Sequence, residues 1–437
     1  MSEPESTDQS KRKRFSALTI DIRPLKASRD YRLLYTGQFV SGFGSAISYV
    51  VLPWQVYQLT KSTFAVGMLG VVECVPMILA AFIGGSLADF VDRRKLVVGA
   101  EIGLGLCSSL LAINSLLSTP HVWLVFVVSA VFAGLNGIHR PALESLTPRL
   151  VDAEHLPAVS ALSVLRYSFN FIVGPAIGGI IATSLGAASA FFIDAITFLI
   201  SIAVLLLIRS VPVPVDPDPI SFRSIVEGFK YACSRRELLG TYLIDINAMF
   251  FGMPMALFPA IADTFGGSSL GLFYAMPALG SMVITTTSGW TSRINRHGLA
   301  VTIAATVWGL AIICFGLANK LWMALFFLAL AGAADCVSGL FRMTIWNQTI
   351  PDHLRGRLAS IELISYMTGP YLGNGEAGIV ASRFGLRTSV VSGGILCVLG
   401  SGILALLLPE FLKYDGREGL LKKQAEEASR AAAAGVS

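Results

Sequence analysis

Residues 63–95 read TFAVGMLGVVECVPMILAAFIGGSLADFVDRRK, and the pattern in this stretch indicates the class of fold. Its first part, 65–88, is mostly apolar and contains a single charged residue type, at Glu73. A helix needs about 20 such residues to cross the hydrocarbon of a bilayer. A polar loop follows directly and contains Arg93, Arg94 and Lys95. The stretch therefore predicts a membrane-spanning helix that ends in a basic loop.

The same pattern recurs along the whole chain of 437 residues. Hydrophobic residues make up 54% of it and charged residues only 14%, whereas a soluble domain carries about a quarter charged residues. Runs of spanning length lie near 34–58, 65–88, 96–117, 122–138, 158–184, 188–208, 238–262, 268–290, 299–317, 321–341, 359–382 and 388–408. We therefore expect an all-α membrane protein with about twelve transmembrane helices in two pseudo-symmetric six-helix halves, because each spanning helix satisfies its own backbone in lipid.

Polar segments divide the chain around these two sets of runs. The expected parts are a cytoplasmic N-terminal segment (1–33), an N-terminal half (34–208), a cytoplasmic linker (209–237), a C-terminal half (238–409) and a cytoplasmic tail (410–437). The proline-rich start of the linker cannot be helical. Phe222, Ile225 and Phe229 then recur at helical spacing, which predicts an interfacial amphipathic helix. The Ala-rich end of the tail is expected to be loosely ordered.

Positive charge is distributed unevenly between the two sides of the predicted membrane. Lys and Arg number 28 on the side of both termini, against 4 in the opposite loops, and Arg166 lies inside a span. Cytoplasmic loops carry the excess of positive charge in membrane proteins. The count predicts that both termini are cytoplasmic and that the protein is a multi-pass protein of the inner (plasma) membrane.

The loop after the second span carries the most specific motif. Gly85, Asp89 and Arg93 follow one another at steps of four, with Arg94 adjacent. Glycine permits close helix approach, and the carboxylate can accept charge-assisted hydrogen bonds from the two arginines. One interpretation is a basic loop that only sets topology, and the other is a charged gate.

This spacing resembles the G-x-x-x-D-x-x-x-R signature of the major facilitator superfamily, and the resemblance covers most of the chain. In that family the motif locks the cytoplasmic side in the outward-open state, so the resemblance implies a gate at these four residues. Two departures stand out: Phe90 replaces the usual basic residue, and Asp92 replaces a glycine. The equivalent loop of the second half, 289–296, has no acid, so we expect the gating charge to rest on the first half.

Span 5 holds a second motif, formed by Gly174, Pro175, Gly178 and Gly179. Small residues permit tight contact between membrane helices, and proline bends a helix, so ordinary packing is one interpretation. The motif also resembles the G-P-x-x-G-G element of exporters in the superfamily. Further stretches resemble the subgroup that contains the bacterial enterobactin exporter and related secretion-type facilitators. The resemblance implies export of a small organic molecule.

The two halves also repeat each other weakly. Residues 137–140 (Gly-Ile-His-Arg), which end span 4, match residues 339–342 (Gly-Leu-Phe-Arg), which end span 10. Duplicated halves around a central site are the architecture of many secondary transporters. The repeat therefore supports the division into two halves.

Ionisable residues inside spans are costly and are functional candidates by default. The candidates for proton carriage or substrate contact are Glu73, Arg166, Asp245, Asp335 and Glu376. Asp194 in span 6 is interpreted as structural. For each acid the alternative is a structural pair with Arg166 or a helix end. Gln38, Tyr49 and Tyr274 are among the polar and aromatic residues that could line a cavity.

Motifs for other kinds of chemistry are not seen in the sequence. It has no G-x-x-x-x-G-K-[ST] loop and no catalytic or metal-ligand motif, so we expect neither an enzyme nor a bound cofactor or metal. The favoured hypothesis is a secondary exporter of a siderophore-like or drug-like molecule by proton antiport. Its expected partners are the substrate, protons and the bilayer, with no nucleic acid, and we expect a monomer. Uptake or lipid movement by the same fold, a membrane-embedded enzyme and a receptor remain as alternatives.

Overall fold

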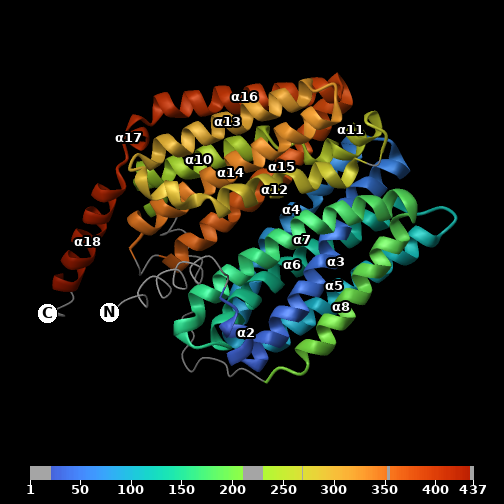
Figure 1. Cartoon of the computed structure of the whole chain (residues 1–437), viewed down its shortest axis with the longest axis horizontal. Helices are drawn as coiled ribbons and strands as arrows, with labels where there is room; N and C mark the ends of the chain where they lie inside the picture. The colour runs from blue at the N-terminus through green and yellow to red at the C-terminus, as the bar shows by residue number, and fades with distance from the viewer. Residues whose placement is uncertain (1–20, 210–229, 268, 352–354, 434–437) are drawn as a thin grey trace, which may run out of the picture.

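The computed structural model describes residues 21–209, 230–267, 269–351 and 355–433. Within these ranges the chain is almost wholly helical, and the one β feature is an isolated bridge between Arg296 and Asp415. The helices form two groups that lie side by side, coloured blue to green and yellow to red in Figure 1. These groups are the two predicted halves, so the predicted fold class is confirmed.

The N-terminal half begins with the short helix α2 (Arg23–Ala27). Six long helices follow: α3 (Arg29–Thr60), α4 (Thr63–Phe90), α5 (Arg93–Leu116), α6 (Val122–Leu146), α7 (Leu156–Ser184) and α8 (Ala187–Leu205). Side-chain caps mark where several of them begin, because the first backbone N–H groups of a helix have no partner within it. Ser28 accepts from the N–H of Tyr31, and Asp92 accepts from that of Arg94 at 2.9 Å.

The C-terminal half repeats this plan with one break. Its elements are α10 (Arg236–Phe251), α11 (Phe258–Thr264), α12 (Leu270–Thr286), α13 (His297–Leu317), α14 (Leu321–Thr349), α15 (Arg355–Phe384) and α16 (Leu386–Leu407). Ten segments of the described chain are long and apolar enough to span, with α10 and α11 counted as one. The 17-residue α12 and the less apolar α15 complete the predicted twelve.

Span 7 is interrupted, which hydropathy alone does not reveal. α10 ends at Phe251, with Gly252 as its C-cap, and α11 begins only after a 3-10 turn over Met255–Leu257. Irregular backbone at membrane depth needs polar partners within the protein. Trp308 Nε1 donates to the carbonyl of Gly252 at 3.1 Å, and Asn374 Oδ1 accepts from the N–H of Ala256 at 2.9 Å. The break is therefore held by α13 and α15.

The tail differs from the expectation. The prediction of a loosely ordered end was wrong for the described part, because α17 (Pro409–Leu412) and α18 (Gly416–Ala433) are helical. Ala, Glu and Lys are strong helix formers, which explains why this polar composition is helical. Phe411 is fully buried and anchors the tail to the C-terminal half. The predicted amphipathic helix at Phe222 to Phe229 lies outside the described residues.

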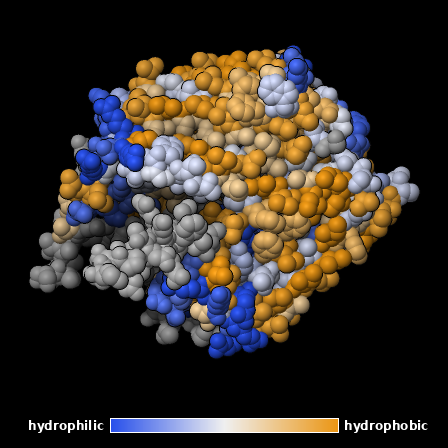
Figure 2. Space-filling view, in the orientation of Figure 1, coloured by the Kyte–Doolittle hydropathy of each residue, from blue (hydrophilic) through white to orange (hydrophobic). Residues whose placement is uncertain are grey.

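The outer surface of the bundle is strongly apolar. Figure 2 shows hydrophobic residues over most of the visible face and hydrophilic ones gathered mainly at one end. Large side chains stand exposed on several helices, among them Leu106 at 61%, Leu199 at 65% and Trp322 at 65%. Exposed apolar area on this scale is costly in water, whereas lipid would solvate it. The surface agrees with a multi-pass membrane protein.

Candidate functional site

The two halves meet through small residues at the end of the molecule away from α2 and α18. Early α4 packs on late α15, where a Cβ on Gly67 would come within 2.9 Å of Gly378 Cα. Late α7 packs on the start of α12, where a Cβ on Gly179 would come within 2.7 Å of Gly271 Cα. Toward α2 and α18 the ribbons of the two halves diverge (Figure 1). Glycines therefore form a tight seam between the halves at one end.

The span-5 motif contributes to this seam. Gly174 and Gly178 face α3, where added Cβ atoms would press on Ala46 and Ile47. Gly179 faces the other half, and the backbone of Pro175 lies against Gly271. The motif thus joins α7 to its own half and to the opposite half at once, which sequence reasoning did not specify.

The predicted gate lies at the opposite end, between α4 and α5. Arg94 donates to the carbonyl groups of Leu205 at 3.0 Å and Leu206 at 2.6 Å, at the end of α8. Positive charge is favourable at a helix C-terminus. Arg93 is buried, with 7% of its surface exposed. Gly85 and Asp89 belong to α4, and their side chains lie outside the described set.

The structure brings three charged groups together in the C-terminal half. Arg342 of α14 forms an ion pair with Asp245 of α10, and its guanidinium also lies 3.9 Å from Asp335 on its own helix. Asp245 and Arg342 are buried, whereas the Asp335 side chain is 41% exposed. Two acids around one arginine leave an excess of negative charge, and the exposed member can meet a solute.

The other predicted residues do not join this cluster. Within the described chain no hydrogen bond or ion pair is found for Glu73 or Glu376, although Glu73 lies within electrostatic range of Tyr371 of the opposite half. Arg166 lies near Tyr31 and Tyr35 and pairs with no acid of the described chain. Asp194 accepts from Ser48 at 2.7 Å and Ser108 at 2.8 Å, as a structural role requires.

A row of aromatic rings crosses from one half to the other. Tyr167 and Phe171 of α7 stack with centroids 4.4 Å apart, and Phe171 lies 5.9 Å from Tyr49 of α3. Tyr49 meets Tyr274 of α12 at 5.7 Å, and its hydroxyl bonds to Met255 Sδ at 3.2 Å. Tyr167 and Tyr49 are 57% and 44% exposed. The row offers aromatic faces to a planar solute.

Sequence reasoning missed one buried acid. Glu101 of α5 is completely buried and receives a 2.6 Å hydrogen bond from Gln38 Nε2. His139 of α6 lies beside it, with Nε2 at 3.5 Å. The sequence placed Glu101 inside a span, so the rule applied to the other acids would have found it. Gln38, interpreted as cavity lining, is buried against this acid instead.

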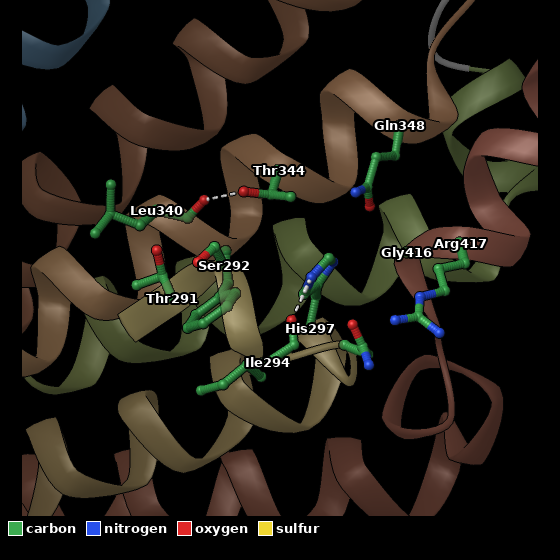
Figure 3. Close-up of a pocket in the computed structure, with 11 residues that line it drawn as sticks. Thr291, Ser292, Ile294, His297, Leu340, Thr344, Gln348, Gly416 and Arg417 are labelled. Carbon is green, nitrogen blue, oxygen red and sulfur yellow. Dashed lines mark hydrogen bonds between the residues drawn. The ribbon is translucent and has the colours of Figure 1, made fainter. Parts of the chain in front are cut away.

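A separate polar pocket of about 260 Å³ lies in the C-terminal half near the tail, and Figure 3 shows it. His297 points into it while its Nε2 bonds to the carbonyl of Ile294 at 2.9 Å, and Gly416 and Arg417 of α18 form one wall. The first turn of α18 thus lines the pocket, and none of the predicted site residues is among the residues that line it.

The sequence is similar to known proteins over most of its length. A profile described as "Transmembrane secretion effector" matches residues 21–420. The curated relatives include the Enterobactin exporter EntS of Citrobacter koseri, 26% identical over 90% of this chain and 95% of that protein. The same exporter of Salmonella choleraesuis is 25% identical over 90% and 96%.

Solved structures of low sequence identity share the fold. The nucleoside transporter NupG superposes with a TM-score of 0.74 at 11% identity, covering 86% of this chain and 99% of that one. A POT family transporter in complex with 5-aminolevulinic acid gives 0.71 at 12% identity, covering 88% and 97%. Both are transporters, and the likeness extends over nearly the whole of each chain.

Proposed function

We propose that this chain, which belongs to the family of transmembrane secretion effectors, is an exporter. Its substrate would be a small organic molecule, siderophore-like or drug-like, which it exchanges for protons. The transport would use alternating access, in which one half rocks against the other around a central site. The inner (plasma) membrane with cytoplasmic termini is the proposed location, and a monomer is the proposed working unit.

The aromatic row is the observation that carries the proposal. Its contact between Tyr49 and Tyr274 joins the two halves beside the seam. That contact has to break if the halves separate at this end. A planar solute could stack on Tyr167 or Phe171. Phe171 lies against Tyr49, and Tyr49 loses its contact with Tyr274 when the halves separate, so the surroundings of the solute differ between the two states. A ligand shifts such an equilibrium only through its different affinity for the two states.

The charge cluster supports the choice of ion. Asp335 is exposed beside Arg342, and Asp245 is buried against the same guanidinium. A proton or a cationic group on the substrate would offset the excess negative charge there. Glu73, near the seam, is a further acid, and unlike Asp245 and Asp335 it has no cationic partner in the described chain. These acids support proton antiport.

The family relatives support the direction and the kind of substrate. The curated relatives named above are exporters of enterobactin, and an aromatic lining suits a catecholate or a planar drug. The gate motif and the seam lie at opposite ends of the bundle, as alternating access requires. In the described state the halves are joined at the seam, so we propose that the site faces the cytoplasm.

Inside-out membrane vesicles would test the proposal. With an acidic lumen, vesicles that contain the protein should accumulate dihydroxybenzoate or ethidium, and vesicles without it should not. Tyr49→Ala should weaken accumulation, because it removes the contact between the halves and one stacking face. Leu106→Ala, at a lipid-facing position, is the matched control. Equal accumulation with and without the protein for both solutes would contradict the proposal.

A further inference from the structure

Two acids are completely buried in the N-terminal half, but their surroundings differ. Asp194 receives hydrogen bonds on both carboxylate oxygens from serines of α3 and α5. Glu101 receives 2.6 Å and 3.4 Å bonds from Gln38 and Ser41 on Oε1 only, and its Oε2 has no hydrogen-bond partner in the described chain. A buried carboxylate that is not fully hydrogen-bonded is expensive unless it is paired or protonated.

His139 is the one basic side chain within ion-pair distance of Glu101 in the described chain. Its Nε2 lies 3.5 Å from Oε1, and this nitrogen also has no hydrogen-bond partner there. The side chain is 13% exposed, against 0% for Glu101, so His139 is the member of the pair that solvent can reach. Histidine is the side chain whose charge ordinarily changes between pH 5 and 8. An imidazole nitrogen can carry a proton or give it up, and the carboxylate of Glu101 is the acid beside it.

The equivalent place in the C-terminal half is built differently. Gln38 and Asp245 occupy corresponding positions in the two halves, because each lies nine residues after the first residue of its helix, α3 or α10. The repeat noted in the sequence matches His139 with Phe341, and Arg342 holds Asp245. Arginine remains charged at any working pH. One half therefore holds its acids with an arginine, and the other places a histidine, whose ring can be neutral or cationic, beside its acid.

The other charged groups around Glu101 and His139 either pair elsewhere or form no ion pair with these two residues in the described chain. Asp30 of α3 pairs with Arg209 at 3.0 Å, and Arg140 beside His139 pairs with Glu144 at 3.2 Å. The remaining ionisable residues on the helices packed around the pair are Arg29, Arg32, Glu73, Asp89, Arg93, Arg94, Lys95 and Asp194. The side chain of Asp89 lies outside the described set, and none of the others forms an ion pair with Glu101 or His139 within the described chain.

We propose that Glu101 and His139 together form the proton-binding site that couples export to the gradient, an inference that rests on the proposed function. The pair holds one proton in its neutral state, either as glutamate with imidazolium or as glutamic acid with imidazole. Loss of that proton leaves a buried net charge of minus one. The pair therefore binds one proton from one side of the membrane. It releases that proton to the other side when a rearrangement of α3, α5 and α6 exposes the pair there. Only an N–H or O–H bond forms or breaks.

Vesicle transport separates this inference from the proposed function. In inside-out vesicles one unit of acidity in the lumen should drive about tenfold accumulation of ethidium by one-for-one antiport. Glu101→Gln and His139→Gln should both reduce this accumulation to near unity while downhill ethidium exchange continues. His155→Gln, at the start of α7, is the matched control and should accumulate as the wild type does. The amide introduced by Glu101→Gln can still bond to Gln38, so this variant preserves packing.

The outcomes are distinguishable. If the wild type itself ignores the gradient, proton antiport fails, and this inference fails with it. If the wild type responds and both variants respond equally well, the pair is not the coupling site, although the proposed function stands. Infrared difference spectra between acidic and alkaline pH give a readout without transport. A protonated-carboxyl band that Glu101→Gln removes and His139→Gln shifts is expected, and unchanged bands in both variants would overturn the inference.

Discussion

Valine at position 179 should open the seam between the halves. A Cβ on Gly179 would lie 2.7 Å from Gly271 Cα and 3.5 Å from the carbonyl carbon of Leu270. These are backbone atoms of the opposite half, so no side-chain rotation relieves the contact. Overpacking of this kind typically costs about 1–3 kcal/mol. Because the contact exists only when the seam is closed, the cost falls on that state alone.

The free energy converts directly into a change of population. A cost of about 1–3 kcal/mol lowers the ratio of seam-closed to seam-open molecules by about 5-fold to 150-fold. Spin labels on Ser184 at the end of α7 and Thr264 at the end of α11 would report it, since both residues are exposed and belong to different halves. Pulsed electron resonance should show a longer distance for Gly179→Val than for the unsubstituted seam.

The control uses the same substitution where it meets nothing. A Cβ on Gly402 of α16 would have no atom within 4 Å, so Gly402→Val should leave the distance distribution unchanged. Gly179→Val should also slow transport, because the closed seam becomes costly to form. A labelled Gly179→Val protein with the distance distribution of the wild type would refute the assignment of this glycine to the moving seam.

Three further perturbations have definite outcomes. Arg342→Gln leaves Asp245 buried without its cation, and such a loss costs about 3–5 kcal/mol, so thermal unfolding in detergent should begin at a clearly lower temperature. Adding Asp245→Asn should recover part of the lost stability. An unchanged unfolding temperature in both variants would contradict the pairing. Asp89→Asn should leave the protein folded but slow transport, since it removes the acid of the predicted gate, whereas equal rates at equal expression would show that this motif does not gate. Cysteine at Lys320 should react with an impermeant reagent from outside the cell and cysteine at Asp216 should not, and labelling of Asp216 from outside would reverse the proposed orientation.

Much of the fold follows from hydropathy and charge, because a spanning helix needs a long apolar run regardless of its neighbours. The run at 65–88 is found as α4, Thr63–Phe90. The interruption of span 7 was not predicted, since an apolar composition does not show where Trp308 and Asn374 supply partners for free backbone groups. Span 10 continues as helix to Thr349, which places Arg342 within α14 rather than at its end.

The site could be predicted only as a set of residue types. Intramembrane acids stand out in the sequence, but their partners lie on other helices and depend on how each helix is rotated about its axis. Arg342 rather than Arg166 therefore meets Asp245, and Glu101 meets His139. His139 was interpreted as lying at the end of a span. The helix α6 instead continues to Leu146, which brings His139 inside the bundle.

Proton flux measured together with substrate flux would separate antiport from its alternatives. Purified protein in liposomes with a pH dye in the lumen would be given ethidium outside, with no other gradient. Antiport predicts that the lumen becomes alkaline as ethidium enters, because protons leave in exchange. Entry of ethidium without any change of lumen pH, or with acidification, would contradict proton-coupled export by this protein.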